Sequence, residues 1–261
     1  MKLIINAVSD IGNVRTNNED MILVGNEFLR DASKNYEFDF ESSEYPFLIA
    51  VADGMGGHKG GKYASEIVLA EMNKAVRDLN KELSNAELKG VLGERIMAIH
   101  KRLLDEGAKD SEKTSMGSTF VGILFFQGSV FFINVGDSRL YRFREGILTQ
   151  LSRDHSLSEM SNNPDVPKNI IINSFGAGKK IFFDFEDISQ RIMNDDKILL
   201  CSDGLNSELT DDEIEPILTN ENGSSLLVEA AKIKEGKDNI SVIIILYKVE
   251  NTTQIDPSKP K

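Results

Sequence analysis

The sequence of 261 residues predicts an α+β fold in which long helices pack against antiparallel sheets. Two segments place apolar side chains at helical spacing, whereas most other apolar segments are short and are separated by glycine, asparagine and aspartate. Gln127-Gly128 and Glu145-Gly146 lie between such short segments and are typical of hairpin turns. Hairpins favour antiparallel pairing over the regular strand-helix alternation of a doubly wound sheet.

The predicted helices lie in two parts of the chain. In residues 61–84 and 86–105 the apolar side chains fall on one face, which predicts two long amphipathic helices packed on a flat surface. Shorter helices are expected at residues 211–218 and 224–234, the second beginning at a serine, a favourable helix cap. Residues 25–45 are polar and acidic and predict a long loop or irregular insertion. Apolar segments elsewhere predict strands at residues 3–8, 21–24, 47–52, 118–126, 130–135, 140–144, 181–185, 197–202 and 240–247.

Composition limits the domain organisation and the classes of partner. With 40% apolar residues and no repeat or low-complexity linker, residues 1–249 are expected to form one domain, followed by a disordered tail at 250–261. A net charge of -12 argues against nucleic acid and anionic membrane surfaces. The apolar runs are shorter than the roughly 20 residues of a membrane helix, so we expect no membrane insertion. Cys201 lies in an apolar run and is expected to be a buried thiol. We also expect the protein to be a monomer and to be located in the cytoplasm.

Five aspartates share one local context, the end or the start of a predicted strand. Asp53, Asp137 and Asp203 follow apolar segments, and Asp20 and Asp238 come just before strands. Strand ends can meet at one edge of packed sheets, and converging carboxylates are tolerated mainly when cations neutralise them. Oxygen ligands without paired histidines or cysteines favour Mg²⁺ or Mn²⁺ over zinc.

A glycine-rich segment follows the first of these strands. Residues 53–61 contain five glycines and lead directly into a predicted helix, more than a turn requires. Asp-Gly pairs taken alone are usually turns, but Gly54 also allows its carbonyl to approach a cation. Arg15 lies five residues before Asp20, and a guanidinium can hold two phosphate oxygens, although a lone loop arginine is usually a solvated charge.

Taken in order, seven segments resemble the metal-dependent protein phosphatases of type 2C, in particular the bacterial branch. The resemblance implies a single αββα sandwich, two packed antiparallel sheets flanked by helices, with a short flap and with metals in a cleft at one end. The matching segments, which span nearly the whole chain, are residues 9–20, 51–65, 116–119, 136–141, 153–156, 200–204 and 237–241.

The resemblance also implies a role for each site residue. Asp53 would bridge two Mn²⁺ or Mg²⁺ ions, with the Gly54 carbonyl on one ion and Asp203 and Asp238 on the other. The ions would activate a hydroxide for in-line attack on phosphorus, and Arg15 would stabilise the phosphoryl oxygens.

Three acidic residues complete the implied metal site. Glu19 and Asp20 would hold metal-bound waters. Asp137, together with Asp203, would hold a third and weaker cation.

Two positions depart from the family pattern. Eukaryotic members have a histidine proton donor after the Asp-Gly pair, where this chain has Met55; His58 is more readily a structural residue of the turn. The flap, residues 156–180, is short and has Asn173 where bacterial members have an arginine. His155, in the Asp-His-Ser turn, is expected to have a structural role. The flap is therefore expected to differ most in its substrate contacts.

The expected function is the hydrolysis of phosphoserine and phosphothreonine in proteins. The expected partners are phosphoproteins and a Ser/Thr kinase that shares these substrates. Two other functions stay open. A catalytically silent metal-binding regulatory module typically loses core aspartates, which this chain retains. A hydrolase of a small phosphorylated metabolite on the same fold would have the same metal site.

Overall fold

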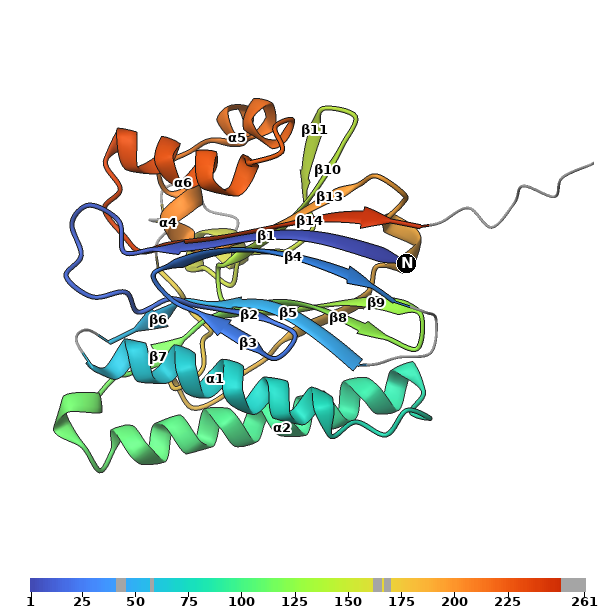
Figure 1. Cartoon of the computed structure of the whole chain (residues 1–261). Helices are drawn as coiled ribbons and strands as arrows, with labels where there is room; N and C mark the ends of the chain where they lie inside the picture. The colour runs from blue at the N-terminus through green and yellow to red at the C-terminus, as the bar shows by residue number, and fades with distance from the viewer. Residues whose placement is uncertain (41–45, 57–58, 162–165, 167–169, 250–261) are drawn as a thin grey trace, which may run out of the picture.

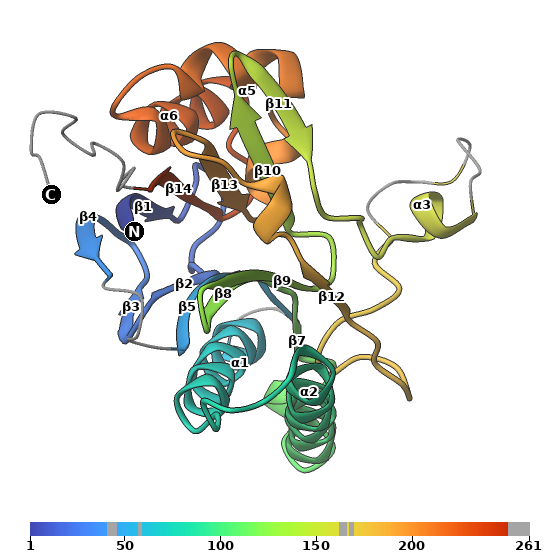
Figure 2. The same ribbon diagram turned by 90° about the vertical axis from the view of Figure 1, so that its right-hand side faces the viewer.

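Two six-stranded antiparallel sheets lie face to face in the computed structural model, which describes residues 1–40, 46–56, 59–161, 166 and 170–249 (Figures 1 and 2). The first sheet has the order β11-β10-β13-β14-β1-β4 and the second the order β12-β9-β8-β5-β2-β3. The strands of the first sheet are β1 (Lys2–Asp10), β4 (Ala32–Asp39), β10 (Arg139–Arg144), β11 (Ile147–Gln150), β13 (Lys197–Cys201) and β14 (Ile240–Lys248). Those of the second are β2 (Met21–Val24), β3 (Glu27–Leu29), β5 (Pro46–Ala52), β8 (Phe120–Phe126), β9 (Ser129–Val135) and β12 (Asp184–Asp187).

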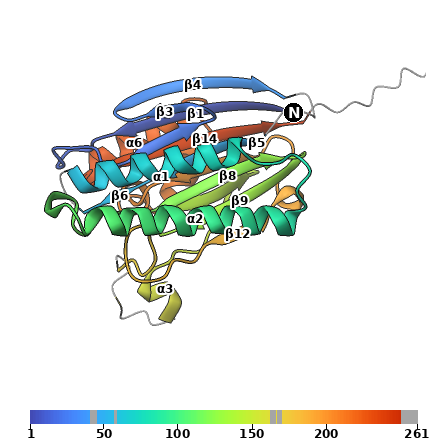
Figure 3. The same ribbon diagram turned by 90° about the horizontal axis from the view of Figure 1, so that it is seen from below.

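Helices cover the outer face of each sheet, so the predicted αββα sandwich is confirmed. The long helices α1 (Lys59–Arg77) and α2 (Asn85–Gly107) lie side by side over the second sheet (Figure 3). On the first sheet lie α4 (Asp203–Asn206), α5 (Asp211–Leu218) and α6 (Gly223–Lys234). The short helix α3 (Leu157–Ser161) extends away from both sheets (Figure 2). A two-stranded sheet, β6 (Gly54–Met55) with β7 (Gly117–Ser118), and two 3₁₀ turns (Ser111–Lys113 and Ser189–Arg191) complete the fold.

Apolar side chains fill three layers of this sandwich. Because successive residues of a strand point to opposite faces, each central strand contributes to the layer between the sheets and to an outer layer beneath helices. Each layer consists largely of apolar side chains that are almost fully buried. Examples are Ile5, Ile49, Val121 and Ile243 between the sheets, Val68, Leu92, Leu124 and Ile133 beneath α1 and α2, and Leu199, Leu205, Val242 and Leu227 beneath α4 to α6.

The two long helices agree with their predicted positions except at one end. Ser84 caps α2, since its hydroxyl accepts from the Glu87 N–H while the Glu87 carboxylate accepts from the Ser84 N–H. Helix α1 ends at Arg77, earlier than the apolar pattern predicted, although Leu79 and Leu83 still pack into the core. Their helical spacing therefore reflects burial and not helical backbone.

The expectation of a long loop at residues 25–45 was wrong. That part of the chain contains β3 and β4, and β4 pairs with β1 along its whole length. Strand β4 is the edge of its sheet and is largely exposed, so only Tyr36 and Phe38 mark its inner face. A mostly polar edge strand lacks the apolar alternation by which strands are recognised.

Within the described ranges, none of the helices has the length and apolar character that a membrane crossing requires. Cys201 is fully buried in β13, and burial raises the pKa of its thiol to about 12. The expected tail, residues 250–261, lies outside the described residues.

Candidate active site

The five aspartates meet at the edge where β5 ends and β2 begins. Asp53 follows β5, Asp20 precedes β2, and Asp137 lies in the turn between β9 and β10. Asp203 is the first residue of α4, directly after β13, and Asp238 precedes β14. Because these strands come from both sheets, the sandwich itself brings together carboxylates that are distant in the sequence.

Mutual repulsion shows how close these carboxylates are. Burial is the main cause that raises the pKa of Asp53 well above its ordinary value, and the other four aspartates add to the increase. Burial and neighbouring carboxylates also raise the pKa of Asp20 and of Asp137, each to about 7. The pKa of Asp203 is raised for the same reasons. Positive charge at this edge would therefore stabilise the ionised carboxylates.

Two of the buried carboxylate oxygens lack donors. Asp137 Oδ1 and Asp203 Oδ1 have no hydrogen-bond partner among the described residues. An unpaired buried carboxylate oxygen is costly, and a cation is one group that satisfies it. The donor set is oxygen alone, as Mg²⁺ and Mn²⁺ prefer. These residues therefore fit a divalent cation.

In the part of the chain that the structure describes, no three His, Cys, Asp or Glu side chains form a ready-made cation cage. The carboxylates have other contacts. Asp238 Oδ2 accepts from Arg15 Nη2 at 2.6 Å, and Asp20 Oδ2 accepts from the Ser202 hydroxyl at 2.6 Å. A Mg²⁺ site typically uses one or two carboxylates and keeps several waters, so it does not require such a cage.

Arg15 points toward the carboxylates from the loop between β1 and β2. Its guanidinium is about half exposed and forms an ion pair with Asp238. The hydrogen bond to Asp238 is the main cause that raises the pKa of Arg15, with smaller contributions from Glu19 and Asp53. The guanidinium thus lies at the mouth of the site, where an anion can reach it.

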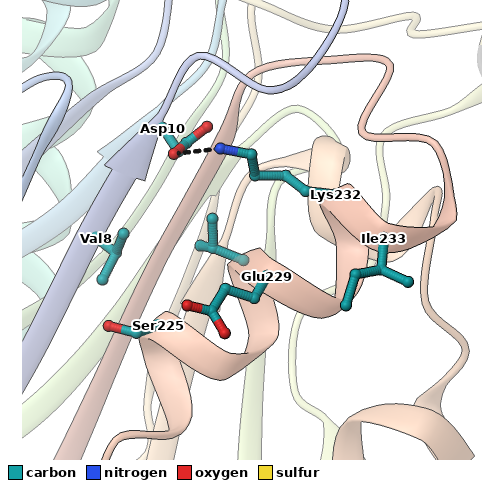
Figure 4. A pocket seen from close by; sticks show the side chains of 7 residues that line it. Val8, Asp10, Ser225, Glu229, Lys232 and Ile233 are labelled. Carbon is teal, nitrogen blue, oxygen red and sulfur yellow. Dashed lines mark hydrogen bonds and ion pairs between the residues drawn. The ribbon is translucent and has the colours of Figure 1, made fainter.

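The loop that carries Arg15 is anchored on the C-terminal end of α6. Figure 4 shows the ion pair between Asp10 Oδ2 and Lys232 Nζ, 2.9 Å apart, beside an open hollow of about 510 Å³ between β1 and α6. The Asn13 N–H donates to Gly236 O at 2.8 Å. Gly12 has a positive φ of 79°, and a Cβ there would overlap the backbone oxygen of Asp238. This loop is thus held against the Asp238 turn.

Gly54 is packed where no side chain fits. A Cβ at Gly54 would overlap Gly61 O and lie 2.6 Å from Glu19 O, and one at Gly61 would overlap the Glu19 carboxylate. The glycines at both positions therefore let α1, β6 and the Glu19 backbone approach closely. His58, in the same glycine-rich segment, lies outside the described residues.

Two supporting residues were missed by the sequence analysis, although both lie in the motif segments. Thr119 accepts from the Asp53 N–H at 3.0 Å and donates its own N–H to Asp53 O at 2.9 Å. Its hydroxyl also contacts the Ser138 hydroxyl, next to Asp137, at 2.7 Å. The sequence did contain a signal for Thr119, because it is a hydroxyl residue in one of the motif segments, residues 116–119.

The other missed residue is Asn239, which follows Asp238. Its side-chain oxygen accepts from the Glu19 N–H at 2.8 Å. Its amide group donates to Ile11 O at 2.9 Å and to Asn17 O at 3.0 Å. One buried amide thus holds both ends of the Arg15 loop, which only the folded structure could show.

The family model for protein phosphatase 2C matches residues 25–227. The chain belongs to the protein phosphatase 2C family. It is 30% identical over 222 residues to the serine/threonine phosphatase stp of Listeria monocytogenes, covering 79% of this chain and 86% of the relative. It is 28% identical to the protein phosphatase PhpP of Streptococcus pneumoniae, covering 95% and 98%. The Streptococcus agalactiae serine/threonine phosphatase structure superposes with a TM-score of 0.77 at 27% identity, covering 94% of this chain and 100% of that one.

This family is metal-dependent, and the chain is accordingly a metal-dependent protein phosphatase. The resemblance drawn from the motifs is confirmed. The family model matches a stretch that begins after Arg15 and Asp20 and ends before Asp238. The alignments with PhpP and with the Streptococcus agalactiae structure are longer and cover 95% and 94% of this chain.

Proposed function

We propose that this protein phosphatase hydrolyses phosphoserine and phosphothreonine in other proteins, with two Mn²⁺ or Mg²⁺ ions held at the aspartate edge. The observation that carries the assignment of the site is a set of five aspartates, in which the buried Asp53 has its pKa raised further by the other four carboxylates. Asp53, Gly54, Asp203 and Asp238 would hold the two ions. Divalent cations at such a site lower the pKa of water, which supplies a hydroxide nucleophile at neutral pH.

The remaining acidic residues would complete the coordination. Glu19 and Asp20 would bind waters around the ions, which agrees with the position of Asp20 beneath the Ser202 hydroxyl. The Asp137 carboxylate, with one oxygen unpaired, would hold a third and weaker ion together with Asp203.

Arg15 would hold the phosphoryl group. Its guanidinium is about half exposed, and its ion pair with Asp238 is partly exposed as well, so exchange for a dianionic phosphate costs little. A guanidinium can donate two hydrogen bonds to one phosphate, which fixes the orientation of the phosphorus as well as neutralising charge.

The leaving-group oxygen needs a proton, and the side chain next to Gly54 cannot supply one. Met55, a thioether, takes the position where eukaryotic relatives have a histidine. Of the two histidines that the structure describes, His155 is hydrogen-bonded at both ring nitrogens and His100 is buried in α2. We therefore assign the proton to solvent at the mouth of the site.

Further proposals follow from the family and from composition. The substrates would be phosphoproteins of a Ser/Thr kinase, and the site of action would be the cytoplasm in bacterial signalling. The enzyme would work as a monomer, with residues 1–249 as its single domain and 250–261 as a disordered tail.

The test compares substrates under matched conditions. Phosphothreonine and phosphoserine peptides and a panel of small phosphorylated metabolites are incubated with the enzyme in Mn²⁺, with Asp203→Asn as the inactive control. We expect kcat/KM to be highest for the phosphopeptides and lost in the control. A metabolite preferred over every phosphopeptide and phosphoprotein would overturn the proposed substrate class, and inactivity of the wild type with every divalent cation would favour a silent module.

A further inference from the structure

His155 forms hydrogen bonds through both ring nitrogens while almost fully buried. Nδ1 lies 3.1 Å from the Gly136 backbone nitrogen and 2.7 Å from Asn173 Nδ2, and Nε2 lies 3.0 Å from Asp184 Oδ2. A backbone N–H can only donate, so Nδ1 must be the acceptor. Nε2 therefore carries the hydrogen and donates it to the Asp184 carboxylate, which fixes the tautomer by geometry.

The orientation of the Asn173 amide is also fixed by its neighbours. Its oxygen accepts from the Phe182 N–H at 3.1 Å, and its nitrogen donates to Phe182 O at 2.8 Å. The second amide hydrogen is left to point at His155 Nδ1. Every polar atom of this buried side chain is thus satisfied, and a reversed amide would break all three contacts.

These two side chains connect the flap to the turn that holds Asp137. His155 binds Gly136 twice, since its backbone N–H also donates to Gly136 O at 2.9 Å. Gly136 has a φ of +114°, and a Cβ there would lie 2.7 Å from the Thr119 side chain, so only glycine fits in this turn. Asp137 is the next residue, and its carboxylate follows the position of Gly136.

On the flap side, the Asn173 side chain holds the backbone of Phe182 next to it through two hydrogen bonds. The Ile172 N–H donates to His155 O at 2.9 Å, and the Phe182 ring packs on the imidazole with centroids 4.5 Å apart. One imidazole therefore contacts the flap on its face and at Nδ1, and contacts the Asp137 turn at the same Nδ1.

We propose that His155 and Asn173 are positioning residues that set the place of the Asp137 carboxylate and make it depend on the conformation of the flap. The inference rests on the proposed function only in assigning a cation to Asp137. Neither residue touches the substrate; both act through Gly136.

A matched pair of substitutions separates the two sides of the imidazole. In His155→Asn the amide oxygen can take the place of Nδ1 and accept from Gly136, whereas the contact with Asp184 is lost. In His155→Gln the longer amide can reach Asp184, whereas the bond to Gly136 is lost. Asp137→Ala sets the scale of a complete loss, and Lys180→Ala, an exposed flap residue, is the surface control.

The first readout is the Mn²⁺ dependence of aryl phosphate hydrolysis. Residues that orient a metal ligand typically contribute 10–100-fold, so we expect His155→Gln and Asn173→Ala to lower kcat or raise the half-maximal Mn²⁺ concentration by about tenfold. KM for the aryl phosphate should change less than about twofold, since Arg15 is not involved. His155→Asn should lie close to wild type and Lys180→Ala should equal it.

The second readout does not depend on activity. Nitrogen-15 NMR of the wild type should show the hydrogen on His155 Nε2, and exchange of the Gly136 amide hydrogen should be faster in His155→Gln and Asn173→Ala than in His155→Asn. A hydrogen on Nδ1, or equal exchange in all variants, would overturn the inference even in an inactive protein. If the wild type is active but His155→Gln keeps the wild-type Mn²⁺ dependence, the coupling is refuted while the phosphatase function stands. Should His155→Gln not fold, Asn173→Ala decides by the same measurements.

Discussion

The aspartate edge and the flap form two parts of one enzyme, but they are built differently. The aspartates lie next to the ends of mostly buried strands, such as β5 before Asp53 and β13 before Asp203. Thr119 also fixes the Asp53 backbone with two hydrogen bonds. The flap pairs with the body where Phe175 bridges to Ser118 of β7, and within itself where Ser156 bridges to Ile171; its helix α3 has no buried residue. Chemistry is thus placed on the rigid frame, and the part most free to vary lies on a segment with little core of its own.

This difference predicts that substitutions in the two parts should affect different kinetic constants. Changes at the aspartate edge should act on every substrate alike. Changes at the exposed helix α3 of the flap should depend on the size of the substrate, whereas Asn173, which contacts His155, should act on every substrate. The following experiments test this division, from the largest expected effect to the smallest.

Loss of a metal ligand should have the largest effect. Asp203→Asn is expected to lower kcat by roughly 10² or more for both aryl phosphate and phosphopeptide, because the remaining ligands would hold the cations poorly. The fold should persist, since the buried Asp203 Oδ1 makes no hydrogen bond among the described residues and an asparagine has nearly the same volume without the charge. Steady-state kinetics and thermal melting check both points; wild-type turnover in this variant would show that the site is misplaced.

Arg15→Ala should have an intermediate effect. We expect KM to rise by about tenfold for both substrates, because a bidentate guanidinium contact with phosphate is lost. A fall in kcat as well would report an interaction that strengthens in the transition state. Arg15→Lys is the matched control and should recover only part of the loss; an unchanged KM in Arg15→Ala would contradict the proposed role.

Flap substitutions should discriminate between substrates. Leu157 and Met160 are large apolar side chains of α3 that are 39% and 45% exposed. Leu157→Ser combined with Met160→Ser is expected to lower kcat/KM for a phosphoprotein by about threefold, since these partly exposed side chains together would lose apolar contact worth about 0.7 kcal/mol. Hydrolysis of an aryl phosphate should not change; equal losses on both substrates would show that α3 supports the metal site and does not contact the substrate.

The smallest effect concerns the stability of the metal-free protein. The pKa values of Asp20 and Asp137, about 7 when folded, exceed the ordinary unfolded value near 3.8, so the folded state binds more protons between these values. The contribution of these two protonated carboxyls to the free energy of unfolding is therefore fully present below the unfolded pKa and is lost as the pH rises toward about 7. In chelator, Tm should fall across this window, and Mg²⁺ at the upper end should restore it. A Tm that rises over the same window would contradict the burial of these carboxylates.

Most of the frame could be predicted from the sequence because it rests on strong patterns. The segment at β2 was predicted at its true bounds, and the aspartates at strand ends were expected to meet, as their electrostatic coupling supports. Strand β4 was missed because its polar edge has no clear alternation. The tertiary contacts of Asn239 and Asn173 could not be foreseen, since each links segments far apart in the chain or across a loop.

The central claim is that the aspartate edge holds two catalytic cations with Asp53 between them. Its most direct test counts the Mn²⁺ ions bound per chain by isothermal titration calorimetry, for wild type and for Asp53→Asn, with turnover measured in parallel in Mn²⁺ and in chelator. The account predicts two tightly bound ions and a weaker third in the wild type, no turnover in chelator, and loss of tight binding in Asp53→Asn. Undiminished turnover in excess chelator, or equal tight binding of Mn²⁺ by both proteins, would contradict it.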